Sequence, residues 1–213
     1  MNPADYEAWY HTPRGRWVGE TEYALAAHQL APQPGDSLLD VGCGTGWFTR
    51  RAAADDLVAT GIDPNAAWLD YARAHSSPAL NWVEGDARAL PFADASFDHV
   101  LSIAALCFVD DERQAVAECV RVARHRFAIG WLNRRSLLYL KKGRGGGSGA
   151  YRGARWHTAG EVRTLFCGLP VRNLKLRSGI FLPAATSVSR GLEAVIPAGL
   201  PWGGLLLLTG EKA

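Results

Sequence analysis

Short apolar runs and longer amphipathic stretches alternate along this chain from residue 18 to residue 132. Short, nearly continuous apolar runs indicate buried strands, and apolar positions spaced by three and four indicate helices. The pattern predicts helices at 18–31, 46–54, 65–75 and 111–123. It predicts strands at 37–41, 57–62, 80–84, 97–102 and 126–132, with a loop at Pro91. Such alternation means βαβ units, and therefore an α/β fold with a parallel, doubly wound sheet.

The pattern changes after residue 132. Two further apolar runs, at 171–180 and 204–209, predict two more strands, with an insert from Pro183 to Pro201 between them. A chain of 213 residues with ordinary apolar content is long enough to bury one good core. We therefore expect a single domain.

The charge is distributed unevenly. The net charge is +2, but residues 1–120 hold 7 Lys/Arg and 18 Asp/Glu, a balance of −11. Residues 121–213 hold 16 Lys/Arg and 3 Asp/Glu, a balance of +13. Ten Lys/Arg and no acid lie between Arg121 and Arg155. Two interpretations stay open: a solvated surface that balances the acidic half, or a binding surface for an anionic acceptor or partner.

Targeting and metal signals are not seen. No run approaches the ~20 apolar residues of a membrane span, and the first residues do not have the pattern of a signal peptide. The cysteines Cys43, Cys107, Cys119 and Cys167 form no Cys-x-x-Cys pair and have no histidine at metal-ligand spacing. We expect buried, reduced thiols, no metal, and a cytoplasmic location.

The most informative run is Leu-Leu-Asp-Val-Gly-Cys-Gly-Thr-Gly-Trp-Phe at 38–48. It indicates a buried strand ending in Asp40, then a glycine loop and the start of a helix, whose N–H groups form an electropositive cradle. A dinucleotide-binding loop, Gly-x-Gly-x-x-Gly, needs its third glycine at position 47, which is Trp47 here. The third glycine is Gly46 instead. The spacing does not match a dinucleotide site.

Two further acids end predicted strands. Asp63 stands 23 residues after Asp40 in Thr60–Asn65, where it is suited to accept hydrogen bonds from two ribose hydroxyls. Asp86 ends the next strand, in Trp82–Ala87. The carboxyl ends of parallel strands meet at the edge of the sheet where ligands bind in such folds. The three acids together favour a nucleoside cofactor.

With these motifs and Phe97–Ile103, the chain resembles class I S-adenosylmethionine-dependent methyltransferases, in the small-molecule group that includes ubiquinone- and biotin-pathway enzymes. The resemblance covers residues 35–125. It implies a seven-stranded, mostly parallel Rossmann-like sheet of order 3-2-1-4-5-7-6 with the last strand antiparallel. It also implies S-adenosylmethionine as cofactor and S-adenosylhomocysteine as product. Within one domain at 1–213, we expect an N-terminal lid and helix (1–31), a cofactor-binding core (35–132), and an acceptor-side region with a terminal hairpin (133–213).

The resemblance also implies roles for the motif residues. Asp40 orders the loop and reaches the methionine amino group through water or backbone, Asp63 holds the ribose, and Asp86 takes the adenine amine. The Ala87 N–H reaches a ring nitrogen, and the Ile103 carbonyl lies near the methionine ammonium. Arg16 or Tyr6 takes the methionine carboxylate. The predicted cofactor-binding residues are Tyr6, Tyr10, Arg16, Asp40, Gly42, Gly44, Asp63, Pro64, Asp86, Ala87 and Ile103.

Two segments fall outside the nucleotide-binding motifs. Tyr6–Trp17 holds four aromatic residues and two arginines in a pattern too irregular for a core helix alone. It is similar to a lid that folds over the methionine end of the cofactor, and a peripheral aromatic cluster is the alternative. Gly143–Gly149 is too rich in glycine to hold one structure unaided. It is either a flap that orders over the acceptor or a plain flexible loop.

The acceptor is the least determined part. Ser102–Val109 lacks the Asn/Asp-Pro-Pro-aromatic motif of amino-directed nucleic-acid methyltransferases, which argues against base methylation and favours an apolar pocket. Asn133 and Ser136 are either polar anchors or helix caps. No catalytic residue is evident, and His157 and Tyr151 are weak candidates for a base. The predicted substrate-binding residues are Leu106, Phe108, Trp131, Asn133, Arg155 and Trp156, with further lining from residues 183–202.

Three functions therefore compete. The first is transfer of a methyl group to a small-molecule acceptor, anionic if the basic half binds it, by in-line displacement in a desolvated pocket. The second is a nucleic-acid or protein methyltransferase that docks through the basic half. The third is a non-catalytic protein that binds S-adenosylmethionine. The sequence favours the first, and it does not predict the oligomeric state.

Overall fold

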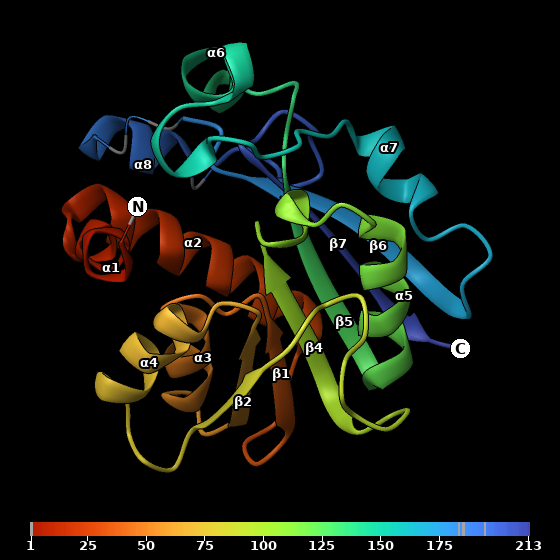
Figure 1. Ribbon diagram of the computed structural model, residues 1–213. Coiled ribbons are helices and arrows are strands. Elements are labelled where there is room, and N and C mark those ends of the chain that lie inside the picture. Colours follow the sequence, from red (N-terminus) through yellow and green to blue (C-terminus); the bar gives the residue numbers. More distant parts are fainter. Residues whose placement is uncertain (1, 183, 185, 194) are drawn as a thin grey trace.

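The computed structural model describes residues 2–182, 184, 186–193 and 195–213, and shows a sheet covered by helices on both faces (Figure 1). Seven strands pair in the order β3-β2-β1-β4-β5-β7-β6. Strand β7 is antiparallel to both of its neighbours, and the other pairs are parallel. The predicted order and the antiparallel last strand are confirmed. The strands are β1 (Ser37–Val41), β2 (Val58–Asp63), β3 (Asn81–Glu84), β4 (Phe97–Ile103), β5 (Ala123–Leu132), β6 (Val171–Gly179) and β7 (Leu205–Lys212).

The predicted helices are present, and the structure adds others. Helix α2 begins at Pro13 rather than at residue 18, because the Thr12 side chain caps its N-terminus by accepting from the Gly15 N–H. The helices are α1 (Pro3–His11), α2 (Pro13–Leu30), α3 (Trp47–Ala53), α4 (Ala66–Ala74), α5 (Glu112–Val122), α6 (Leu137–Lys142), α7 (Ala159–Thr164) and α8 (Ser187–Glu193). Short 3-10 turns are η1 (Leu106–Phe108), η2 (Arg144–Gly146) and η3 (Gly149–Tyr151).

The core has two layers, one on each face of the sheet. Alternate side chains of each strand point to opposite faces, so Leu38 packs with α2 and α3 while Leu39 packs with α5. Phe127 of β5 and Phe166, just after α7, stack at 5.4 Å between ring centroids on the α5 face. The two layers hold the sheet rigidly, and the carboxyl ends of β1, β2 and β4 meet at one edge.

The acceptor-side region contains structure that the sequence pattern did not predict. Helix α6 follows β5 because Ser136 caps it, accepting from the Tyr139 N–H. The glycine-rich segment 143–149 forms short turns held by the Ser148 N–H on the Lys142 carbonyl. Pro183, at the start of the predicted insert, lies outside the described residues.

The cysteines differ in their exposure to solvent. Three cysteines are buried, but Cys167 is exposed, so the expectation of buried thiols is wrong at that position. In the part of the chain that the structure describes, no helix is long and apolar enough to cross a membrane.

Candidate functional site

The glycine loop joins β1 to α3 and is tied to the neighbouring strand. The N–H groups of Gly42 and Cys43 both donate to the Ile62 carbonyl, at 2.8 and 3.1 Å. Gly42 has φ +75°, and a Cβ there would lie 2.3 Å from the Cβ of Ala105. Gly46, at φ +84°, caps α3 and lies against the ring of Trp82. The loop therefore needs glycine for its positive φ and for its close contacts.

Asp63 ends β2 and holds the loop from the side. Its carboxylate accepts from the Gly44 N–H and from the Asn65 N–H, both at 2.9 Å. Burial raises the pKa of the Asp63 carboxyl, while these two N–H donors oppose the rise. The side chain is half-buried and carries carboxylate lone pairs beyond those two bonds. It lies where a ribose-binding acid was predicted.

Asp40 is buried beneath the loop. Its carboxylate accepts from the Thr49 hydroxyl at 2.6 Å, which ties β1 to the first turn of α3. Burial raises the pKa of Asp40 to about 7, although the bonds from Thr49 favour its ionised form. Thr49 is a site residue that sequence analysis missed, and its only signal was a polar position on the buried face of α3.

Aromatic rings cover the loop. A Cβ on Gly44 would lie 3.2 Å from the ring of Trp68, and the same ring lies 5.0 Å from that of Tyr6 between centroids. Tyr10 stacks on Trp47 at 4.8 Å, and the hydroxyls of Tyr6 and Tyr10 lie 3.4 Å apart. Trp68 was not predicted as a site residue because its helical position alone gave no sign that it faces the loop.

The predicted lid is helical. Residues 6–17 are divided between α1 and α2, and Tyr10 is buried between them and α3. The segment is not one helix, because Thr12 caps a new helix start at Pro13 and divides the pattern between two helices. The closure of this segment over a cofactor stays a prediction.

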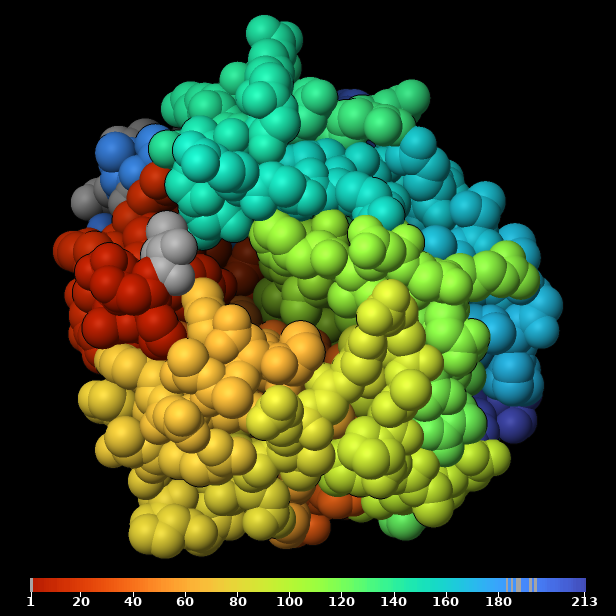
Figure 2. All heavy atoms as spheres, viewed as in Figure 1, coloured from red at the N-terminus to blue at the C-terminus, as the bar shows by residue number. Residues whose placement is uncertain are grey.

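A hollow lies between the N-terminal helices, the α4 region and the segment near residue 150 (Figure 2). Glu22 of α2 is half-buried, and burial raises the pKa of its carboxyl to about 8. Burial also raises the pKa values of Tyr6, Tyr10 and Tyr151, and the charge of Glu22 contributes to each rise. Burial raises the pKa of Tyr151 to about 12, so that its phenol is protonated at neutral pH.

The arginine predicted for the methionine carboxylate, Arg16, is exposed. Arg14 on the same helix is half-buried, and its Nε has no hydrogen-bond partner among the described residues. The role of Arg16 in binding stays a prediction.

The remaining predicted cofactor residues lie around the same edge. The Asp86 carboxylate accepts from the Arg88 side chain at 2.6 and 3.0 Å, so an adenine amine would share it with that guanidinium. Ala87 and Ile103 are buried, and Pro64 is exposed after β2. Their roles in binding stay predictions.

Three of the predicted acceptor residues, Leu106, Trp131 and Trp156, belong to one hydrophobic cluster of the core. Trp131 is fully buried against Phe166, and Leu106 is 1% exposed. Phe108 is 48% exposed, and Trp156 packs against Tyr139 and Tyr151.

Asn133 is buried and is bonded within the protein. Its amide donates to the carbonyls of Pro201 and Gly203 at 3.0 and 2.7 Å, and its side-chain oxygen accepts from the Arg135 N–H. Ser136 is the cap of α6 rather than an open anchor. These contacts hold the end of β5 against the loop before β7.

His157 and Arg155 meet Glu112, at the first turn of α5. His157 Nε2 lies 2.7 Å from one carboxylate oxygen of Glu112, and Arg155 Nε lies 3.0 Å from the other. His157 Nδ1 is buried without a partner among the described residues. The pair orients the imidazole, and a role of His157 or Tyr151 as a base stays a prediction.

Part of the basic half is neutralised in space. Five of the ten cations between residues 121 and 155 form ion pairs: Arg121 with Asp94 and Glu118, Arg124 with Asp98, Arg126 with Glu211, Arg134 with Glu161, and Arg155 with Glu112. Among the described residues, Arg135, Lys141, Lys142, Arg144 and Arg152 form none.

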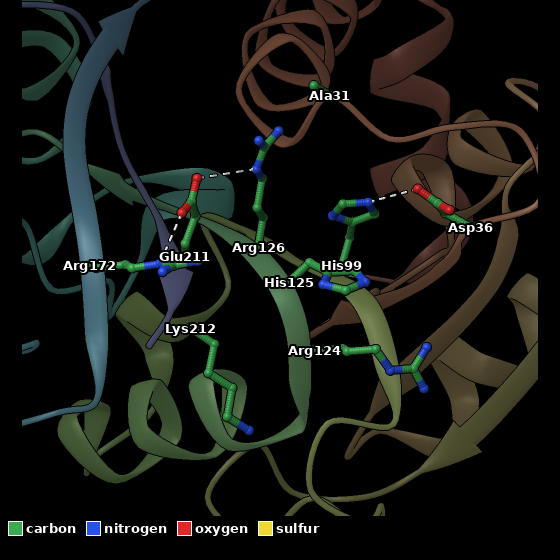
Figure 3. Close-up of a pocket in the computed structure, with 9 residues that line it drawn as sticks. All are labelled: Ala31, Asp36, His99, Arg124, His125, Arg126, Arg172, Glu211 and Lys212. Carbon is green, nitrogen blue, oxygen red and sulfur yellow. Dashed lines mark hydrogen bonds and ion pairs between the residues drawn. The ribbon is translucent and has the colours of Figure 1, made fainter.

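A second pocket lies at the opposite edge of the sheet, near the amino ends of β4 and β5 (Figure 3). It has a volume of about 460 Å³. His99 contacts Asp36 at 3.0 Å, and Glu211 contacts both Arg126 and Arg172. Asp36 precedes β1, whereas the glycine loop follows it. The charges that line this pocket largely pair with one another. The pocket lies apart from the carboxyl ends of β1, β2 and β4, the edge that is called the cofactor edge below.

Comparison with known proteins agrees with this geometry. Residues 39–126, which span the glycine loop, Asp63, Asp86 and β4, match the family model described as a methyltransferase domain. This part of the chain is similar to a methyltransferase domain. Outside the matched residues lie α1, α2 and the acceptor-side region at 133–213.

Relatives and solved structures are similar to a larger part of the chain. An uncharacterized protein of Mycobacterium tuberculosis is 34% identical over 84% of this chain and 62% of its own length. A malonyl-[acyl-carrier protein] O-methyltransferase of Hahella chejuensis is 33% identical over 71% of this chain and 56% of its own. The chain thus spans about three fifths of these relatives. A Thermotoga maritima structure described as a methyltransferase, possible histamine N-methyltransferase, has the same fold, with a TM-score of 0.74 and 23% identity over 99% of this chain and 95% of its own.

Proposed function

We propose that this protein transfers a methyl group from S-adenosylmethionine to a small molecule. The observation that carries the proposal is the junction of β2 with the glycine loop, where Asp63 holds the Gly44 N–H. This junction places an acid, a bent glycine backbone and the start of α3 at one edge of a sheet with the methyltransferase order. The match of residues 39–126 to the methyltransferase domain supports it.

The side chains at this edge suit such a cofactor. The Thr45 hydroxyl is buried in the loop without a partner among the described residues, and the Nε of Arg14 is in the same condition. A buried polar group without a partner costs about 1 to 3 kcal/mol. A nucleoside with an amino-acid end would satisfy both groups, with Asp63 accepting from ribose hydroxyls and Arg14 donating to a carboxylate.

The chemistry asks little of acid–base groups. S-adenosylmethionine supplies an electrophilic methyl group, and transfer is an in-line displacement in which positive charge disappears. The protein therefore acts mainly by aligning the reacting groups and excluding water, which can lower a barrier by roughly 7 to 11 kcal/mol. The rings of Tyr6, Tyr10 and Trp68 form an aromatic cluster beside the glycine loop. This cluster would exclude water from the methionine end of the cofactor.

Incubation with methyl-labelled S-adenosylmethionine and a fractionated metabolite extract tests the activity. The proposal expects label in a small-molecule fraction, identified by mass, and loss of that product in Asp63→Ala. Label only in RNA or protein would contradict the small-molecule assignment. Binding of the cofactor without any labelled product would favour the non-catalytic alternative.

The unpaired cations favour docking on nucleic acid or protein as the second candidate. Salt-dependent retention of the protein on RNA would support it, since phosphate contacts release counterions and weaken steeply with salt. The small-molecule proposal expects no such retention at physiological ionic strength.

We also propose that the acceptor is anionic. Arg155→Glu is unsuitable as a test, because it would place two carboxylates together at Glu112 and disturb α5. Arg152, which is exposed and follows Tyr151, avoids that problem. Once an acceptor is found, raising ionic strength should raise its KM, and Arg152→Glu should raise KM further without changing cofactor affinity. A KM indifferent to both would show that these cations only balance the acidic half.

A further inference from the structure

Helix α6 and the loop before β7 form an exposed surface that mixes apolar and basic side chains. Leu137, Leu140 and Trp202 are 47, 49 and 59% exposed and line one groove of about 360 Å³. The α6 surface consists of these three side chains, Arg134 and Arg135, which line the same groove, and the exposed Lys141 and Lys142 at the end of the helix. Single exposed apolar residues are common, but three that line one groove indicate a contact surface.

The exposed leucines do not result from poor packing of α6. Leu138 on the same helix is buried, and its side chain lies against Gly204 at the start of β7. Helix α6 therefore already has an inward apolar contact, and Leu137 and Leu140 form a second one that faces outward. Within the described residues, no other segment covers them.

Apart from Arg134, which pairs with Glu161, the cations of the surface have no carboxylate partner among the described residues. Arg135, Lys141 and Lys142 form no ion pair among the described residues, and Arg144 and Arg152 just beyond α6 form none either. The sequence has no acid from residue 133 to residue 160. Several unpaired cations therefore lie on or just after the helix that carries the apolar groove, and a local excess of positive charge favours an anionic partner.

We propose that the α6 surface docks the protein on an anionic lipid bilayer. Lys and Arg beside exposed Leu and Trp are the composition of an interfacial membrane contact, in which the apolar side chains enter the headgroup boundary. Lysine is depleted at protein–protein interfaces, so the adjacent Lys141 and Lys142 disfavour a protein partner. Unpaired cations suit the diffuse negative potential of a leaflet, which does not require fixed geometry.

The place of the α6 surface in the fold bears on where a methyl acceptor would come from. Helix α6 lies at the same end of the molecule as the carboxyl edge of β4, and the segment after it borders the hollow (Figures 1 and 2). A bilayer on the α6 surface would therefore lie at the same end of the molecule as the hollow. If the proposed methyl transfer holds, on which this step alone rests, the acceptor is an amphiphile drawn from the lipid surface.

Vesicle co-sedimentation tests the docking without any cofactor or turnover. The full chain is mixed with vesicles of phosphatidylcholine alone or of an equimolar mixture with phosphatidylglycerol. The proposal expects binding to the anionic vesicles, little binding to the neutral ones, and weakening as salt is raised. Failure of this test leaves the methyl-transfer proposal untouched, and loss of methyl transfer leaves this test untouched.

Matched variants separate the α6 surface from general charge. Lys141→Glu, on the helix face of Leu137 and Leu140, should lower partitioning onto anionic vesicles by about fivefold or more, and Leu140→Ala by about threefold or more. Their controls are Lys175→Glu and Leu174→Ala, which change exposed residues on β6. Lys175 pairs with Thr209, several register positions from the Leu205 end of β7 that α6 approaches. The controls should stay within about twofold of the parent protein.

The orientation has its own readout. Brominated lipids quench tryptophans that enter the bilayer, so quenching should fall in Trp202→Phe and persist in the β6 controls. Equal binding to neutral and anionic vesicles would overturn the proposal. So would equal losses in the α6 variants and their controls, or binding to an acidic protein in solution with none to vesicles.

Discussion

At the scale of single residues, the cofactor edge depends on backbone that only glycine adopts easily. Gly42 combines a positive φ with contact against Ala105, so that a side chain there would be strained twice. Gly46 repeats the arrangement against Trp82. The three glycines of the motif thus serve the protein's own packing as well as the approach of a ligand.

Gly42→Ala tests that strain. It should lower the free energy of unfolding by about 1 to 3 kcal/mol, because the left-handed φ is unfavourable for alanine and its Cβ meets Ala105. Denaturant unfolding measures the change. Gly160→Ala in α7 is the control, since nothing crowds that position, and it should be neutral or stabilising by about 0.5 to 1 kcal/mol. Equal effects of the two variants would contradict the packing argument.

Glu22 predicts a pH dependence of stability. Its folded pKa is about 8, against an ordinary value of 4.5. Between these two pKa values the folded protein keeps the proton that the unfolded chain has released. The free energy of unfolding therefore falls as pH rises, and the contribution of Glu22 is lost above the folded pKa. Asp40, with a folded pKa of about 7, acts in the same direction.

Glu22→Gln should therefore flatten the stability profile. The free energy of unfolding of the variant, minus that of the parent, should be about 1 to 3 kcal/mol larger at high pH than at low pH. The reason is that the variant forms no buried charge when the pH rises. Unfolding at pH values of about 5 and about 8.5 measures it. An unchanged difference between the two pH values would show that Glu22 is solvated in the folded protein.

At the scale of elements, α1 is the segment whose role is least tied to the sheet. Its main contacts are with α2, α4 and the aromatic residues of α3, and none of these main contacts is with a strand of the described sheet. Such a helix opens more readily than the strands it covers. Its rings nevertheless reach the glycine loop through Trp68, which couples the helix to the cofactor edge.

Hydrogen exchange tests that coupling. The amides of residues 5–17 should exchange more slowly when S-adenosylhomocysteine binds, because a ligand held between the loop and α1 opposes opening of the helix. The amides of α5, on the other face of the core, should change little. Equal exchange of residues 5–17 with and without ligand would make the N-terminal aromatics ordinary packing.

At the scale of the whole molecule, the sequence predicted the fold best where the local apolar pattern matches the burial of the strands in the folded protein. The buried strands β1, β2 and β4 lie within one or two residues of their predicted bounds, because uninterrupted apolar runs leave few alternatives. Asp40 and Asp63 could be placed at one edge because strand ends fix the direction of the chain.

The rest depends on contacts that no local pattern records. Arg14 rather than Arg16 is partly buried because of how α2 turns against its neighbours. Trp131 was predicted to line a pocket, but it lies in the core against Phe166. The basic stretch was judged by its neighbours in sequence, whereas half of its cations pair with acids from distant segments. Burial and ion pairing are properties of the folded molecule.

Calorimetric titration with S-adenosylhomocysteine tests the central claim most directly. The account predicts that the parent protein binds this ligand in preference to NAD, and that Asp63→Ala weakens binding by about 2 to 4 kcal/mol. That loss has two causes, since the variant lacks both the ribose acceptor and the support of the Gly44 N–H. Asp70→Ala, an exposed acid of α4, is the charge-matched control and should bind as the parent does. Unchanged affinity in Asp63→Ala, or tighter binding of NAD, would contradict the account.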